Sequence, residues 1–333
     1  MFIKVIHWLR NSLLALISLL LVLSLAGIVY QVLATARDVR RYPPPGQLID
    51  VGGYQMHLYC TGERQVDRPT VILDASYPAT VSSWVWIQPQ LTAVTRVCAY
   101  DRAGTGWSDS SPNTLTIGQM AEDLHTLLEK SSESAPYLLI GHSWGGGVTR
   151  LFAATYPQLV RGLVQIEATH PETWSRRGLP DSTLGGMPPA QVASIPLLAR
   201  LGIFRLLPAL RGSWGIVPGL PEQQQAELIA YFNTTKWANE IVAVEKALPE
   251  SLEQLRQVDS VGNMPLLLVI GSISEEATGV GLELQVELGK LSTNSQTFWV
   301  EGADHSSLVH DPELAQQTGT VILEWLRNLP MEN

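Results

Sequence analysis

The stretch from Gly141 to Gly145 constrains this chain more than any other, because it reads G-x-S-x-G with Ser143 at its centre. It directly follows the apolar run Tyr137 to Ile140 and precedes a helix-compatible run from Gly146 to Tyr156. A strand, a glycine turn and a helix in this order form the context in which the motif marks a nucleophilic serine. The flanking glycines are needed because a Cβ would collide with neighbouring backbone in so tight a turn. A chance match in a glycine-containing loop is the alternative, and the flanking elements argue against it.

The first forty residues are of a different kind. From Leu13 to Ala34 the chain is almost continuously apolar, over about 22 residues, which is enough to cross a hydrocarbon core as a helix. Basic residues flank both ends of this run, so the distribution of charge does not orient it. The alternative is a cleaved signal peptide, since Ala34-Thr35-Ala36 is similar to a cleavage site, but signal peptides have shorter apolar regions. We expect residues 1–36 to form a single-pass membrane anchor, with secretion after cleavage as the alternative.

The composition excludes some classes of partner. The 333 residues carry a net charge of −9, and no basic stripe is present to neutralise phosphates, so a nucleic-acid partner is not expected. Hydrophobic residues make up 45% of the chain, which provides for a large core. The two cysteines, Cys60 and Cys98, cannot form a metal site alone, and no cofactor motif is present. We expect both to be reduced core residues in strands, with a disulfide as the alternative if the domain lies outside the cytoplasm.

The pattern of apolar runs divides the chain into segments. Residues 37–46, with Pro43-Pro44-Pro45, predict an extended linker. Residues 47–169 and 262–333 alternate strand and helix patterns, which predicts an α/β core with a mostly parallel sheet and helices on both faces. Residues 170–261 interrupt this alternation with prolines and short helical patterns, and we interpret them as an inserted helical cap; ordinary surface helices are the alternative.

A serine hydroxyl needs a base within hydrogen-bond reach, and histidine suits that role because its pKa lies near neutrality. His305 is the best candidate among the histidines. It immediately follows the predicted strand Gln296 to Val300 in a short loop, and open α/β sheets place their ligands beyond the carboxyl ends of their strands.

With these residues identified, the chain from Gln47 to Leu329 resembles the α/β-hydrolase superfamily. The resemblance rests on the G-H-S-W-G motif, on Gly302-Ala303-Asp304-His305, and on the sequence D-R-A-G-T-G-W-S over residues 101–108. It implies a sheet of about eight strands and a catalytic triad in the order serine, acid, histidine. The Asp101 loop is expected to be structural.

The acid of the triad has two candidates. The resemblance places an Asp after the strand Pro265 to Ile270, but that position is Ser274, and Glu275 follows it. Glu167 instead ends the preceding strand, where some members of the superfamily carry the acid. We favour Glu167 because a strand end holds a carboxylate more rigidly than a glutamate-rich loop does, and orienting the imidazole is the task of the acid. Glu275 remains the alternative.

Two backbone N–H groups are expected to form the oxyanion hole. One belongs to Trp144, the residue after the nucleophile. By resemblance the other belongs to Tyr77, in the loop Asp74 to Pro78, although the usual His-Gly pair is replaced there by Ala75-Ser76.

These residues predict a membrane-anchored serine hydrolase of the esterase or lipase type that acts on small to medium apolar acyl substrates. It is expected to use a Ser143-His305-Glu167 triad, an acyl-enzyme intermediate, and no cofactor or metal. The alternatives are amide or peptide cleavage of the aminopeptidase type, C–C bond hydrolysis, a cofactor-free peroxidase-like reaction, or a catalytically silent fold used for binding. Retention of both Ser143 and His305 argues against the silent fold.

Overall fold

The computed structural model describes residues 2–180, 189–211, 217–275 and 278–329 of the 333. One eight-stranded sheet organises them, in the order β1-β2-β4-β3-β5-β6-β7-β8. Strands β3 to β8 are all parallel, while β2 pairs antiparallel with both β1 and β4. The predicted α/β, mostly parallel sheet is therefore confirmed. The strands are β1 (Gln47–Asp50), β2 (Gln55–Thr61), β3 (Thr70–Asp74), β4 (Val97–Tyr100), β5 (Tyr137–His142), β6 (Val160–Ile166), β7 (Leu266–Gly271) and β8 (Ser295–Val300).

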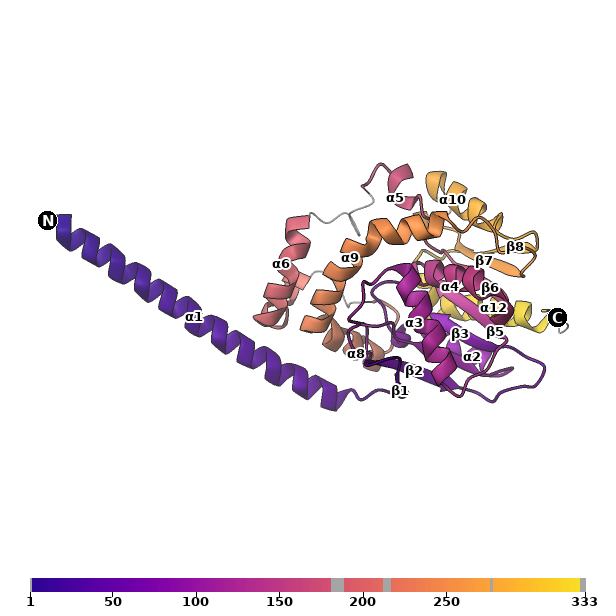
Figure 1. Cartoon of the computed structure of the whole chain (residues 1–333), viewed down its shortest axis with the longest axis horizontal. Helices are drawn as coiled ribbons and strands as arrows, with labels where there is room; N and C mark the ends of the chain where they lie inside the picture. The colour runs from indigo at the N-terminus through magenta and orange to yellow at the C-terminus, as the bar shows by residue number, and fades with distance from the viewer. Residues whose placement is uncertain (1, 181–188, 212–216, 276–277, 330–333) are drawn as a thin grey trace.

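The helices fall into three groups in the chain. One long helix precedes the sheet, a set of helices lies between β6 and β7, and the rest alternate with the strands (Figure 1). They are α1 (Phe2–Arg41), η1 (Val81–Trp84), α2 (Gln88–Leu91), α3 (Ile117–Lys130), α4 (Trp144–Thr155), η2 (Pro157–Leu159), α5 (Thr173–Arg176), α6 (Pro189–Arg200), α7 (Ile203–Leu206), η4 (Pro208–Arg211), α8 (Glu222–Phe232), α9 (Thr235–Arg256), α10 (Gly279–Gly289), α11 (Ser307–His310) and α12 (Pro312–Arg327).

Successive side chains of the central strands serve two different cores. In β5, Leu139 belongs to an apolar cluster that includes Leu124 of α3 and Phe152 of α4. Its neighbour Leu138 belongs to the cluster on the opposite face, which includes Ile322 of α12. Because both faces are covered, central strands such as β3 and β5 are buried along their whole length, which explains why they read as continuous apolar runs.

The helices α5 to α9 form what we call the cap. They connect β6 to β7 and lie inside the predicted cap segment 170–261, of which residues 181–188 and 212–216 are outside the described residues. A small apolar cluster of the cap includes Phe204, Phe232 and Trp237 and stands apart from the two sheet cores.

Helix α1 is one straight element of 40 residues that projects from the globular part (Figure 1). It continues to Arg41, so the prediction that an extended linker begins at residue 37 is wrong for its first half. The helix ends only where Pro43 approaches, since the residue before a proline disfavours helical backbone. The connection that follows is held to the domain: the Trp107 indole N–H donates to the Tyr42 carbonyl (2.8 Å), and the Gly46 N–H donates to His57 Nε2 (3.0 Å).

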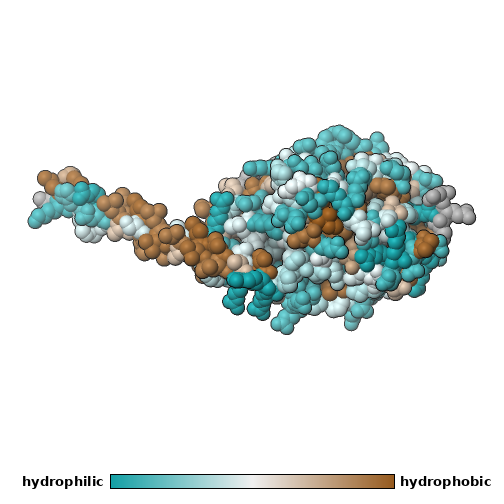
Figure 2. Space-filling model, turned by 60° about the horizontal axis from the view of Figure 1, so that its bottom comes forward, coloured by the Kyte–Doolittle hydropathy of each residue, from teal (hydrophilic) through white to brown (hydrophobic). Residues whose placement is uncertain are grey.

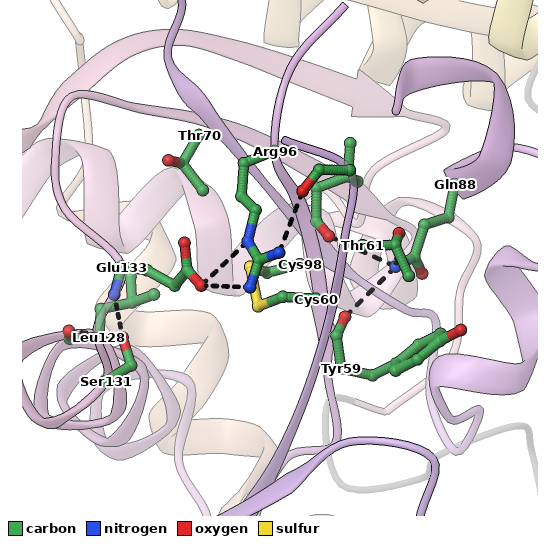
Figure 3. Close-up of a disulfide and its surroundings, with 12 residues drawn as sticks. Tyr59, Cys60, Thr61, Thr70, Gln88, Arg96, Cys98, Leu128, Ser131 and Glu133 are labelled. Atoms are coloured by element: carbon green, nitrogen blue, oxygen red, sulfur yellow. Dashed lines mark hydrogen bonds and ion pairs between the residues drawn. A yellow bond between two sulfur atoms is a disulfide. The ribbon is translucent and has the colours of Figure 1, made fainter. Parts of the chain in front are cut away.

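Cys60 and Cys98 form a disulfide, which corrects the expectation that both are reduced (Figure 3). The register of β2 against β4 places the two residues directly opposite each other, with their Cα atoms 4.0 Å apart. The sequence did not predict this pairing, because apolar patterning does not reveal that β2 lies antiparallel to β4 or which residues of the two strands face each other. Beside the disulfide, the Arg96 guanidinium bonds the Glu133 carboxylate at 2.9 Å (Figure 3).

Candidate functional site

Ser143 stands on the sharp turn between β5 and α4. Its backbone has φ 54° and ψ −117°, a conformation that residues other than glycine rarely adopt. The expected role of the glycines is confirmed by the space around them. A Cβ at Gly141 would lie 2.5 Å from the Gly145 carbonyl oxygen, and one at Gly145 would overlap the carbonyl of Asp74. The turn is therefore packed so closely that only glycine fits beside the serine.

The end of β6 fixes this turn from the other side. The Ser143 N–H donates to the Ile166 carbonyl (3.0 Å), and the Ser143 carbonyl accepts from the Thr169 N–H (2.9 Å). Glu167 lies between these two residues and also has a positive φ, of 39°. Two strained residues on adjacent strand ends thus hold a hydroxyl and a carboxylate at the same edge of the sheet.

Glu167 and His305 are brought into direct contact. Glu167 Oε2 lies 2.7 Å from His305 Nδ1, and the Glu167 side chain is fully buried. The other oxygen, Oε1, accepts from the Gly271 N–H (2.7 Å) and from the Ser274 hydroxyl (2.6 Å). The carboxylate is therefore fixed by three hydrogen bonds, and the imidazole is oriented by a group that cannot rotate freely.

Glu275 lies elsewhere in the same region. Its side chain is 88% exposed, and its Oε2 pairs with Arg177 at 3.2 Å. The hydrogen bond to His305 Nδ1 is made by Glu167, the acid that the sequence analysis favoured.

Ser143, Glu167 and His305 line one open pocket of about 530 Å³, together with Trp174 and Ile273. The bond from Nδ1 to Glu167 fixes the tautomer in which Nδ1 carries the proton and Nε2 is free to accept one.

His142 supports the backbone of the proposed base. Its Nε2 lies 3.0 Å from the His305 carbonyl oxygen, and the two rings are in contact with centroids 4.7 Å apart. Burial, together with the nearby His305 and His310, holds the pKa of His142 well below its usual value. His142 is thus a neutral donor at ordinary pH, and its ring packs beside that of the proposed base.

The loop expected to form the oxyanion hole is held by Arg102. The buried guanidinium of Arg102 pairs with the Asp74 carboxylate and donates to the carbonyls of Ala75 (2.7 Å) and Ser76 (2.9 Å). With its carbonyls turned toward Arg102, the loop leads into Tyr77, the residue whose N–H is the proposed donor. Tyr77 is half-buried and packs against both the sheet core and the cap cluster.

Trp144 is the first residue of α4, so its N–H has no acceptor within the helix. The helix N-terminus also carries partial positive charge, which favours a developing oxyanion there. Its side chain is buried in the sheet core, so only its backbone is available for chemistry.

Two residues of the site were missed by the sequence analysis. Ser274 was noted only as the place where an acid is absent, yet its hydroxyl holds the acid from the neighbouring strand. Arg102 was assigned to a structural loop, yet it positions the backbone of the proposed oxyanion loop. A polar residue retained where the superfamily has its acid was the one available signal for Ser274.

The cap contributes a buried carboxyl beside the loop of residues 101–108, which contains Arg102. Glu240 of α9 accepts a hydrogen bond from the Tyr231 hydroxyl (2.7 Å) and packs against Gly104. Burial raises its pKa to about 7, although the positive charges of Arg102 and Lys236 oppose the shift.

Among the described residues, a cluster outside the pocket carries side chains of the kinds that bind metal ions. Donor atoms of His170, Glu172 and Glu287 lie within 4.8 Å of one another. Both carboxylates, however, already bond the Arg176 guanidinium, at 2.7 and 2.9 Å, so their charge is largely neutralised.

Comparison with known proteins agrees with this fold. A family model described as alpha/beta hydrolase fold matches residues 69–186, the segment from β3 through the Ser143 turn to Glu167 and beyond. The chain has the α/β-hydrolase fold.

Two solved structures have folds similar to that of this chain. The haloalkane dehalogenase DbeA from Bradyrhizobium elkani is 22% identical, with a TM-score of 0.66, over 85% of this chain and 97% of that one. An esterase from Exiguobacterium antarcticum is 18% identical, with a TM-score of 0.64, over 85% of this chain and all of the esterase.

Among curated relatives, an uncharacterized vacuolar membrane protein of Saccharomyces cerevisiae is 31% identical over 134 residues, which are 36% of this chain and 21% of that protein. The chain matches only about a fifth to a third of the length of this yeast protein and the other curated relatives most similar to it.

Proposed function

We propose that this α/β-hydrolase fold protein is a membrane-anchored serine hydrolase that cleaves ester-type acyl bonds. The hydrogen bond from buried Glu167 to His305 Nδ1 carries the proposal, because it prepares an imidazole as base in the pocket that Ser143 also lines. A serine on the turn favours attack on an acyl carbonyl over displacement of a halide, which needs a carboxylate nucleophile.

In the proposed reaction, Ser143 Oγ attacks the acyl carbonyl while His305 Nε2 takes its proton. Glu167 stabilises the imidazolium that forms. The N–H groups of Trp144 and Tyr77 stabilise the oxyanion. The imidazolium then protonates the leaving alcohol, which leaves an acyl-enzyme. His305 next deprotonates a water molecule, whose attack releases the carboxylic acid and regenerates Ser143.

The substrates that we infer are small to medium apolar esters. The pocket is open to solvent, and its walls include Trp174 and Ile273 beside the proposed triad. No step of the proposed reaction requires a cofactor.

Helix α1 is proposed as a single-pass anchor. It is one helix of 40 residues with a mean hydropathy of 2.7 over its most apolar window. No residue of that window is buried against the rest of the protein. Its C-terminal part bonds the cap: Arg205 donates to Gln31 (2.9 Å) and pairs with Asp38 (2.6 Å). These contacts favour retention of the helix over cleavage after Ala36, which would remove Gln31 from a site where it is buried.

The Cys60–Cys98 disulfide supports a location of the domain in an oxidising compartment, because such bonds persist outside the reducing cytosol. On this basis the chain crosses the membrane once, with the hydrolase domain on the non-cytosolic side.

The experiment that tests the proposed chemistry is labelling of the full chain, in detergent, with a fluorophosphonate, combined with hydrolysis of p-nitrophenyl esters of graded chain length. We expect labelling at Ser143, its loss in Ser143→Ala, and turnover that depends on chain length. Failure of the folded wild type to label would favour a binding role for this fold instead.

A further inference from the structure

The second half of the anchor helix α1 lies along the cap. The helix therefore contacts the globular part well before its last residue, Arg41. Gly27 packs so closely against the Leu201 backbone that a Cβ at this position would lie 2.5 Å from the Leu201 carbonyl oxygen. Further along, the buried Gln31 side chain donates to the Asn233 carbonyl (2.6 Å) and accepts from Arg205. The cap segment around α6 and α7 is therefore fixed to the second half of α1 (Figure 1).

This contact limits how far the domain can stand from a bilayer. From Leu13, where the apolar run begins, to Gly27 the helix rises only about 21 Å at 1.5 Å per residue. A hydrocarbon core is about 30 Å thick. Sliding the helix further into the bilayer to clear the cap would bury Lys4 and Arg10, and charged side chains are costly there. The cap beside Gly27 therefore reaches the level of the lipid.

The surface of the cap at this place suits lipid. Four large apolar side chains within fourteen residues are mostly exposed: Leu197 (60%), Leu206 (56%), Leu207 (53%) and Leu210 (59%). Figure 2 shows the apolar surface of the helix running up to its junction with the globular part. Exposed large apolar side chains concentrated on elements that contact each other, here α6, α7 and η4, mark an interaction surface.

A groove of about 420 Å³ separates this part of the cap from the helix. Leu20 and Leu23 line it from α1, and Ile203 and Leu206 line it from α7. Leu206, which is also among the exposed leucines of the cap, thus continues the lipid-facing surface of the anchor.

Basic side chains lie where phospholipid headgroups would be met. Arg37, Arg40 and Arg41 are exposed on the last turns of α1, beyond the apolar run that ends at Ala34. Such residues interact favourably with headgroup phosphates at the membrane boundary.

We propose that α6, α7 and η4 form a membrane-docking surface, which inserts its exposed leucines among the acyl chains beside the anchor helix. The proposal rests on the proposed membrane anchor and extends it, because it makes the cap, and not only α1, a part of the membrane contact. The lipid bilayer is the occupant of the groove, and an apolar ester dissolved in the bilayer is the substrate that this geometry brings to the cap.

The test uses the full chain in phosphatidylcholine vesicles that contain lipids with a nitroxide on the acyl chain. A bimane fluorophore is attached at Leu206→Cys on the cap. Leu20→Cys, on the exposed face of α1, is the control for the anchor. Val66→Cys, 99% exposed on a loop of the core, is the control for the rest of the surface.

We expect the nitroxides to quench the fluorophore at position 206 to an extent comparable with that at position 20, and to leave position 66 unquenched. Quenching at 20 without quenching at 206 would overturn the docking surface while leaving the anchor intact. Absence of quenching at both would overturn the anchor, and the docking surface with it. Equal quenching at 66 would show non-specific adsorption and would also overturn the proposal.

Discussion

Replacing Glu167 by Gln tests the proposed site most sharply, because the hydrogen bonds of this carboxylate determine how the amide must sit. Oε1 accepts from the Gly271 N–H, a donor that cannot reverse its role. The oxygen of the substituted amide must therefore take the place of Oε1, which leaves the NH₂ group in the place of Oε2, facing His305 Nδ1 where the two groups are now 2.7 Å apart.

An amide N–H in that position can only donate to an unprotonated Nδ1. The imidazole is then held in the tautomer that carries its proton on Nε2, and this nitrogen can no longer accept the proton of Ser143. Loss of the correct tautomer in a serine triad lowers kcat by roughly 10⁴-fold, which corresponds to about 5 kcal/mol of transition-state stabilisation. We expect a loss of this size, with KM little changed and the fold intact.

The assay is hydrolysis of p-nitrophenyl butyrate by the full chain in detergent, with the active-site concentration determined from a burst. Glu275→Gln is the matched control, because the exposed Glu275 carboxylate pairs with Arg177 and makes no bond to His305 in the described structure, and we expect it to retain activity within about twofold. Ser274→Ala removes one of two donors to Oε1 and is expected to lower kcat about tenfold, since one hydrogen bond to a charged group contributes about 1.5 kcal/mol. Near wild-type activity of Glu167→Gln together with collapse of Glu275→Gln would refute the reasoning.

Three further predictions concern the turn, the cap and the disulfide. Gly145→Ala should abolish fluorophosphonate labelling of Ser143, because its Cβ would displace the backbone at Asp74; labelling at the wild-type rate would contradict the close packing of the turn. Burial holds the pKa of Glu240 near 7, so the folded state keeps a proton that the unfolded chain loses near pH 4.5, and stability should fall by about 3 kcal/mol as the pH rises through this window. Glu240→Gln should flatten the dependence of Tm on pH between 5 and 8, and an unchanged slope would show that another group is responsible. Replacing both Cys60 and Cys98 by Ser should destabilise the domain by about 4 kcal/mol, given the separation of 38 residues, and urea denaturation with and without reductant measures this.

Much of the fold was readable because its signals are local. Buried parallel strands are continuous apolar runs, and the predicted strand from Pro265 to Ile270 lies within one residue of β7. The end of α1 was misjudged because Arg37 to Arg41 read equally well as a helix end or as a polar linker.

Features that depend on distant residues could not be read in this way. The Ser274 hydroxyl reaches Glu167 across 107 positions of the chain, and the contact of Gln31 with Asn233 spans 202. Glu167, whose carboxylate bonds His305, could be favoured over Glu275 because that argument needed only its place at the end of a strand. The prediction that the cysteines are reduced was wrong because Cys60 and Cys98 meet through the register of β2 and β4, and apolar patterning does not determine a strand register.

The position of the disulfide determines how the domain bears a mechanical load. Once the contacts of α1 with the cap have broken, a pull on the membrane segment reaches the sheet at Gln47, the first residue of an edge strand that pairs only with β2. That strand can be peeled away one hydrogen bond at a time, and the first residues of β2 can follow it. Peeling must stop at Cys60, which is covalently joined to β4 in the interior of the sheet. Tension that enters the sheet through Gln47 is thus carried by a covalent bond before it can reach the strands that hold Ser143 and Glu167.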